Sequence, residues 1–189
     1  MARPIVRCWG SDDPLMTAYH DKEWGRPVHD DQTLFEHLAL DGFQAGLSWR
    51  TILHKREAFR EAFAGFDPER VAQFGSRDLR RLLKNSGIVR NRQKIEATIN
   101  NAQWVLELQR EFGSLDRFIW GFTGRKTLRG AAQADWQGLP TKTPESDAMS
   151  AELKHRGFKF VGSTICYAFM QAVGMVDDHL AVCFRFKPR

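Results

Sequence analysis

The chain has 189 residues, of which 42% are hydrophobic and 27% are charged, values typical of a globular protein with one sizeable core. No apolar run approaches the length of a membrane span, and the first ten residues, MARPIVRCWG, lack the pattern of a secretory signal, so we expect a cytoplasmic protein. The net charge of +5 favours polyanionic partners, and three cysteines are too few for a disulfide framework.

Apolar residues recur at helical spacing along most of the chain, and capping residues mark where helices begin. Asp13 followed by Pro14 predicts a helix to about Trp24, and Asp30 or Asp31 is expected to cap the next. Later helices are expected over residues 51–63, 76–87, 91–112, 114–121, 143–157 and 162–174, and a short one from Asp67, with caps at Ser76, Asn91, Ser114 and Thr143. Residues 123–143 predict a long surface loop, and no segment alternates with period two. We therefore predict an all-α fold with about eight to ten short helices.

One stretch, LDGFQAGLSW at residues 40–49, combines features that do not suit a buried helix. It places the carboxylate of Asp41 among apolar residues, and it ends on a turn that would present a leucine and a tryptophan. Four aromatic residues fall in the first fifty positions, namely Trp9, Tyr19, Trp24 and Trp49. Such rings could stack on flat bases and attract cations, or could simply belong to the core.

A second stretch, SGIVRNRQKI at residues 86–95, predicts a hairpin between two helices. One helix would end at Gly87, whose conformational freedom permits a left-handed turn, and Ile88 and Val89 would plug the hairpin. The free N–H groups of the next helix would then point outward beside the cations Arg90, Arg92 and Lys94. This arrangement is typical of a clamp for the DNA backbone, although an ordinary α-hairpin with a solvated basic face has the same local pattern.

Cysteine and histidine residues stand near both ends of the chain. His179 and Cys183 are four residues apart and would share a face if that segment is helical, and Cys8 and His20 lie far upstream. Two cysteines and two histidines would suit a closed tetrahedral zinc site that joins the N-terminus to the C-terminus. The spacing is not that of a zinc finger, and buried cysteines with unrelated histidines remain the alternative.

Taken together, these segments resemble the DNA-3-methyladenine glycosylase I family, an all-α member of the helix-hairpin-helix glycosylase superfamily. The resemblance runs from about Cys8 to Cys183 and is carried by DPLMTAYHDKEWG, QAGLSW, SGIVRNRQKI, TPESDAMSAELKHRGFKFVGSTICYAFMQAVGMVDDH and the closing H-x-x-x-C. It implies one glycosylase unit over residues 1–189, with the helix-hairpin-helix element at about residues 76–110. It also implies a structural Zn²⁺ that joins the termini through Cys8, His20, His179 and Cys183.

The resemblance further implies which residues form the site. The catalytic carboxylate would be Asp41, where the family usually has glutamate, and Met16 stands where the family often has tyrosine. The base-binding residues would be Trp9, Met16, Tyr19, Trp24, Phe43 and Trp49. The DNA-binding residues would be Gly46, Leu47 and Ser48, with Leu47 as an apolar wedge, together with Gly87, Arg90, Arg92 and Lys94.

The implied activity is that of a monofunctional DNA repair glycosylase. Such an enzyme would flip 3-methyladenine out of double-stranded alkylated DNA and hydrolyse its bond to the sugar, leaving free base and an abasic site. The resemblance implies a monomer with no membrane partner. Two alternatives stay open: a glycosylase of shifted alkyl-base specificity, because Asp41 and Met16 depart from the family pattern, and a non-catalytic module that binds damaged DNA.

Overall fold

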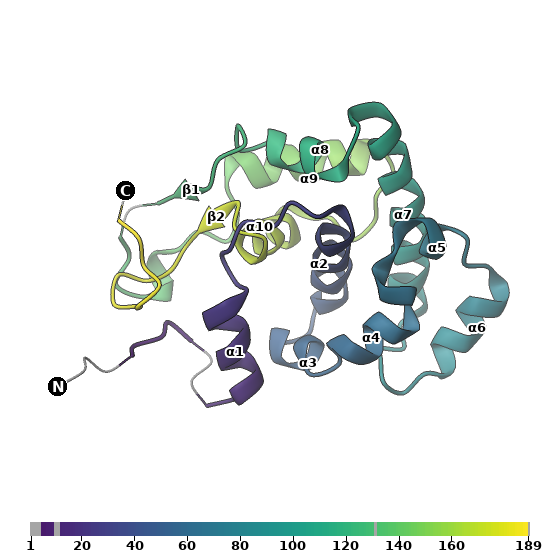
Figure 1. Cartoon of the computed structure of the whole chain (residues 1–189), viewed down its shortest axis with the longest axis horizontal. Coiled ribbons are helices and arrows are strands. Elements are labelled where there is room, and N and C mark those ends of the chain that lie inside the picture. Colours follow the sequence, from purple (N-terminus) through teal and green to yellow (C-terminus); the bar gives the residue numbers. More distant parts are fainter. Residues whose placement is uncertain (1–4, 10–11, 131, 189) are drawn as a thin grey trace.

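The computed structural model describes residues 5–9, 12–130 and 132–188, and the regular secondary structure of this part of the chain is almost entirely helical (Figure 1). The α-helices are α1 Pro14–Lys22, α2 Asp31–Gln44, α3 Trp49–Leu53, α4 Arg56–Ala62, α5 Pro68–Ala72, α6 Ser76–Lys84, α7 Arg92–Phe112, α8 Leu115–Gly121, α9 Pro144–His155 and α10 Ser163–Ala172. Two 3₁₀ turns, η1 Ala64–Phe66 and η2 Trp136–Gly138, and two strands, β1 Leu128–Arg129 and β2 Val176–Asp177, complete the elements. The all-α prediction is confirmed, since the strands form a single short parallel pair with Leu128 opposite Val176.

The predicted helix starts are confirmed where a side chain accepts a hydrogen bond from the first turn. Such N-caps are Asp13, Asp30, Asp67, Asn91, Ser114 and Thr143. Each satisfies backbone N–H groups that have no partner within their own helix, which is why these residue types favour this position.

Three expectations about element bounds were wrong. Residues 51–63 form two helices instead of one: α3 begins at Trp49 behind an N-cap at Ser48, and α4 begins again at Arg56. The N-cap of α6 is Gly75, not Ser76, and that helix ends at Lys84, before the predicted residue 87. The segment 123–143 contains β1 and η2, because pairing with β2 and contacts with the C-terminal segment order it. None of these tertiary contacts is visible in local periodicity.

Helix α2 lies at the centre of the molecule, with α10 and α7 packed against it (Figure 1). All of its residues from Leu34 to Phe43 are buried, including the charged or titratable Glu36, His37 and Asp41. A helix that is buried all round needs partners for its polar side chains. The first and last described segments lie on the same side of the molecule. No helix of the described residues is long and apolar enough to cross a membrane.

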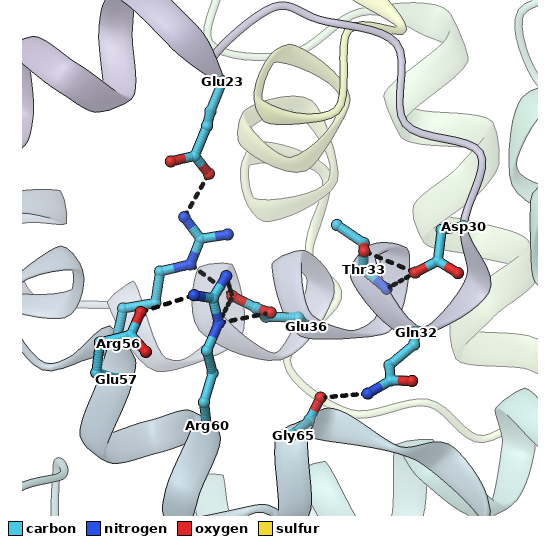
Figure 2. Close-up of polar contacts among 9 residues, drawn as sticks. All are labelled: Glu23, Asp30, Gln32, Thr33, Glu36, Arg56, Glu57, Arg60 and Gly65. Carbon is cyan, nitrogen blue, oxygen red and sulfur yellow. Dashed lines mark hydrogen bonds and ion pairs between the residues drawn. The ribbon is translucent and has the colours of Figure 1, made fainter.

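An ion-pair network ties α2 to its neighbours (Figure 2). Arg56 of α4 donates from Nε to Glu36 of α2 at 2.5 Å and from Nη1 to Glu23, the C-cap of α1, at 2.5 Å. Arg60, one turn further along α4, donates from Nε to both carboxylate oxygens of Glu36 at 3.0 and 3.1 Å. These bonds fix α1, α2 and α4 relative to one another.

Candidate functional site

A cavity of about 210 Å³ lies between α1, the C-terminal half of α2, α3 and α10. Its lining residues are Trp9, Met16, Tyr19, Trp24, Asp41, Gln44, Trp49, Trp136, Ala168, Gln171 and Ala172. Pockets for drug-sized ligands span about 300–1,000 Å³, so this cavity suits a single small ring system. The carboxylate, the methionine and four of the five aromatic residues that the resemblance assigned to the site therefore meet at one place.

The aromatic residues form a continuous wall. The ring centroids of Trp24 and Trp9 are 5.3 Å apart, those of Trp9 and Tyr19 are 6.0 Å apart, and those of Tyr19 and Trp49 are 5.1 Å apart. Tyr19 and Trp24 belong to a small hydrophobic cluster with Leu53. Short contacts between tilted rings hold each plane in place and leave ring faces available to a flat ligand.

Asp41 is 2% exposed, and its Oδ2 has no hydrogen-bond partner. Burial raises the pKa of Asp41 well above its usual range, and the positive charge of Arg56 opposes that rise. Trp49 also lines the cavity, and its indole Nε1 is likewise buried without a partner. A folded protein seldom leaves such atoms unpaired, so an unpaired acceptor group and an unpaired donor in one cavity point to a polar ligand.

Phe43 does not line the cavity, contrary to its assignment as a base-binding residue. Its ring centroid lies 4.6 Å from that of Phe59 and 5.9 Å from that of Phe63, within the main core. Residues two apart on a helix point in nearly opposite directions, so Phe43 and Asp41 cannot face the same space. Gln44, three residues after Asp41 and on its face, lines the cavity instead, and helical spacing could have identified it.

The predicted turn between α2 and α3 is present. Gly46 has a φ of +77°, a left-handed conformation that glycine adopts without strain. Leu47 is 42% exposed, and the hydroxyl of Ser48 accepts a hydrogen bond from the N–H of Thr51. The turn therefore presents one apolar side chain to solvent beside the cavity wall at Trp49.

The hairpin between α6 and α7 is present, but Gly87 has a different role from the predicted one. Gly87 is not in the left-handed region. A Cβ atom there would lie 2.9 Å from the Cβ of Ala58 and 3.0 Å from Oδ1 of Asn85, so close approach, not a left-handed turn, requires glycine. Ile88 is 3% exposed and belongs to the main core, as the plug prediction expected.

The three cations of the hairpin separate into two groups. Arg90 and Arg92 are exposed, and Arg92 pairs with Glu96 at 3.1 Å. Lys94 does not point outward: it is 7% exposed, and its Nζ donates to the carbonyl oxygens of Phe43 and Ala45 at 2.7 and 2.5 Å. Lys94 thus satisfies carbonyl groups at the C-terminus of α2, which is a favourable place for a cation.

Near the two ends of the chain, Cys8, His20, His179 and Cys183 form a cluster that could hold a metal ion. Their ligand atoms all lie within 4.8 Å of one another. Nε2 of His20 is 3.2 Å from Sγ of Cys8 and 3.4 Å from Sγ of Cys183, and Nε2 of His179 is buried without a partner. Each histidine holds a neighbouring carboxylate through Nδ1 at 2.8 Å, His20 with Asp21 and His179 with Asp177. Carboxylates in this position orient imidazole ligands of metals.

The segment that carries His179 and Cys183 is not a helix. It runs from β2 into a series of turns, in which the N–H of Cys183 donates to the carbonyl of Leu180 at 2.8 Å. The shared-face argument for the two residues was therefore wrong. The turns bring them together all the same, and the N–H of Phe184 donates to the carbonyl of Val6 near the other end of the chain at 2.9 Å.

Fold and site together define an all-helical protein with a cavity for one flat, polar ring. The chain matches the methyladenine glycosylase family over residues 9–186. It is 48% identical over 180 residues to DNA-3-methyladenine glycosylase 1 of Escherichia coli K12, across 95% of this chain and 96% of that protein. The chain belongs to the methyladenine glycosylase family.

Solved structures agree with this assignment. A crystal structure of 3-methyladenine DNA glycosylase I is similar with a TM-score of 0.93 and 49% identity, over 96% of this chain and 100% of that one. A variant of a 3-methyladenine DNA glycosylase I, solved in complex with 3-methyladenine, is similar with a TM-score of 0.91 and 38% identity, over 96% of this chain and 97% of that one.

Proposed function

We propose that this chain excises 3-methyladenine from alkylated DNA, and that the cavity at Asp41 receives the extruded base. The observation that carries the proposal is the pair of unpaired buried atoms, Oδ2 of Asp41 and Nε1 of Trp49, inside an aromatic cavity. The edge of an adenine offers both hydrogen-bond donors and acceptors, so one base can satisfy a carboxylate and an indole N–H together. The activity of the relatives supports the same substrate.

Extrusion of the base would use the turn between α2 and α3. Taking a base out of the stack costs a few kcal/mol, and an apolar side chain in the vacated space helps to offset that cost. Leu47 is the exposed apolar residue of this turn, and Trp49 of the cavity wall follows two residues later. We assign Leu47 the role of the wedge and Gly46 and Ser48 the role of shaping its turn.

Chemistry at the cavity would rest on the charge of the base. An adenine methylated at N3 is cationic, and it leaves the sugar as a neutral base, so a strong general acid is not needed. The aromatic wall favours a cation over neutral adenine by roughly 0.5–2 kcal/mol per well-placed ring. A cationic base would also place a positive charge beside the buried carboxyl group of Asp41, so this group can ionise when the base binds. The carboxylate would then orient the base while water attacks C1′ of the sugar.

A panel of duplexes that each carry one alkylated base tests this substrate assignment. We expect 3-methyladenine to be released fastest. Asp41 and Met16 both line the cavity and both depart from the usual family residues, so a shifted alkyl-base preference is the second candidate function. Faster release of another methylated base would favour that candidate. Tight binding to the panel without release of any base would instead favour a non-catalytic module.

We also propose that the hairpin between α6 and α7 is a helix-hairpin-helix clamp for the DNA backbone. The support is the exposed pair Arg90 and Arg92 at the N-terminus of α7, an end of a helix that favours phosphate groups. We expect Arg92→Ala to weaken duplex binding about equally for all sequences, and to lower the slope of log K against log salt by about one unit. Arg110→Ala is the matched control, because Arg110 is exposed and ion-paired at the other end of the same helix. A slope that is unchanged in Arg92→Ala would place the DNA elsewhere.

For the cluster of Cys8, His20, His179 and Cys183 we propose a structural Zn²⁺. Two thiolates and two imidazoles are a common closed set for zinc, with ligand bonds of about 2.0–2.3 Å, and a closed set has no position for a reacting water. The orphaned Nε2 of buried His179 and the carboxylates on both Nδ1 atoms fit this role. The ion would join segments near the two ends of the chain and so make one folded unit of it.

Metal analysis should therefore find about one zinc per chain. We expect Cys183→Ala, or treatment with a chelator, to lower the melting temperature more strongly than it lowers the single-turnover activity of the protein that remains folded. Cys166→Ser is the control, because Cys166 is buried in the main core outside the cluster and its replacement should leave the zinc content unchanged. Folded, active protein that contains no metal would refute the zinc proposal.

A further inference from the structure

Trp136 lines the cavity from a part of the chain that neither periodicity nor the family resemblance singled out. It begins η2, inside the segment 123–143 that was expected to be a plain surface loop. Its side chain is 42% exposed, whereas Tyr19 and Trp24 of the same wall are 2% and 8% exposed. Trp136 therefore stands at the outer edge of the cavity, where a ligand would pass and where its own ring can still lose water.

Several contacts hold Trp136 in this place. Its Nε1 donates to the carbonyl oxygen of Cys8 at 3.1 Å, and its ring centroid lies 6.2 Å from that of Trp24 with the planes tilted by 58°. The turn itself is closed by Asp135, whose carboxylate accepts from the N–H of Gln137 at 2.9 Å. Because the indole N–H is already bonded to the protein, the ring faces are what Trp136 can offer to a ligand.

The ring contact between Trp136 and Trp24 adds Trp136 to the aromatic wall of the cavity. Trp136 follows Trp24, which is followed by Trp9, Tyr19 and Trp49, with centroid separations between neighbours of 5.1 to 6.2 Å. Trp49 and Trp136 are the two ends of this series, and both line the cavity. The aromatic lining of the cavity therefore continues to its exposed edge at Trp136.

We propose that Trp136 is a further base-binding residue, which contacts the alkylated base from the mouth of the cavity. This inference rests on the proposed function, since it concerns the same site. Tryptophan is the aromatic residue that attracts cations most strongly, and the attraction increases when the bound ligand covers the ring and excludes water. The loop that carries Trp136 thus takes part in recognition of the base.

Binding of free 3-methyladenine, measured by isothermal titration calorimetry on the full chain, tests the inference. Free 3-methyladenine is neutral, so this measurement reports stacking of the base on the ring of Trp136. We expect Trp136→Ala to raise the Kd about 5- to 100-fold. Trp136→Phe keeps an aromatic ring but loses the hydrogen bond to Cys8, and it should recover most of the affinity. Gln137→Ala is the matched control, because Gln137 is exposed in the same turn and does not line the cavity. The Kd of this variant for 3-methyladenine should equal that of the wild type.

Two results would overturn the role of Trp136 while leaving the proposed function intact. One is wild-type affinity in Trp136→Ala. The other is an equal loss of affinity in Trp136→Phe and Trp136→Ala, which would mean that only the anchoring hydrogen bond matters. If the wild type itself neither binds 3-methyladenine nor releases it from DNA, the proposed function fails, and the inference fails with it. Circular dichroism of each variant confirms that the fold is retained.

Discussion

Asp41→Asn is expected to slow single-turnover excision of 3-methyladenine by about a hundredfold, which is the order of the loss when one group that stabilises charge at the reacting centre is removed. The substitution keeps the shape of the side chain and one oxygen acceptor, but it removes the negative charge that the cationic base would meet. Asp41 is 2% exposed and its Oδ2 is unpaired, so this oxygen is free to accept a hydrogen bond from the base.

The same substitution should not destabilise the protein. Burial raises the pKa of Asp41, so the folded state holds this proton more tightly than the unfolded state does. Folding is therefore penalised as the pH rises above the ordinary aspartate pKa, and asparagine removes that penalty. At neutral pH the melting temperature of Asp41→Asn should equal or exceed that of the wild type, which separates a role in the site from a role in the fold.

Asp41→Glu is the companion variant. Aspartate is one methylene shorter than glutamate, which moves the carboxylate by roughly 1.5 Å. We expect Asp41→Glu to excise 3-methyladenine as fast as the wild type or faster, because the family resemblance implies glutamate at this position. Wild-type excision by Asp41→Asn, measured on the same preparation as its melting temperature, would remove this residue from the catalytic site.

Arg56→Met is expected to lower the free energy of unfolding by about 3–5 kcal/mol, the usual cost of removing one partner from a buried ion pair. Arg56 and Glu36 have side chains that are only 7% and 8% exposed, and Figure 2 shows Arg56 reaching both Glu36 and Glu23. Methionine would leave the carboxylate of Glu36 buried with only Arg60 beside it. Urea denaturation measures the change directly.

Two control variants make this result specific. Arg60→Met should lower the free energy of unfolding clearly less than Arg56→Met does, because the side chain of Arg60 is 37% exposed and Glu36 keeps its bond to Arg56. The double variant Arg56→Met with Glu36→Leu removes both charges, and it should recover much of the loss, since apolar replacement of a whole buried pair is often neutral. A loss of less than about 1 kcal/mol in Arg56→Met would show that the pair is not an important support of α2.

The features that could be predicted from the sequence are mostly local ones. Asp30 and Asn91 predict their helix starts because the capping bond spans only three residues. The break between α3 and α4 could not be predicted, because Ile52, Phe59 and Phe63 keep a single helical spacing across it and all three are buried. Arg56, the first residue of α4, pairs with Glu36 of α2, and local spacing contains no sign of that contact.

Most of the cavity could be predicted because the family resemblance supplied a residue set, and the structure brings all but one of that set together. The assignment of Phe43 to the cavity was wrong for a local reason, because its side chain on α2 points away from that of Asp41. The buried position of Lys94 and the place of Trp136 in the cavity could not be predicted for a non-local reason. Their partners, the C-terminus of α2 and the carbonyl of Cys8, lie about 50 and 128 residues away along the chain, and no short-range pattern marks either contact.

Release of free base from methylated duplex DNA tests the central claim most directly. The wild-type chain, in excess over a duplex that carries a single 3-methyladenine, should release one free 3-methyladenine for each abasic site formed, with no strand cleavage by the enzyme itself. Unmodified adenine in a matched duplex should stay in place. Binding of the alkylated duplex with no base released, under conditions where the protein is folded, would contradict the assignment of this chain as an active glycosylase.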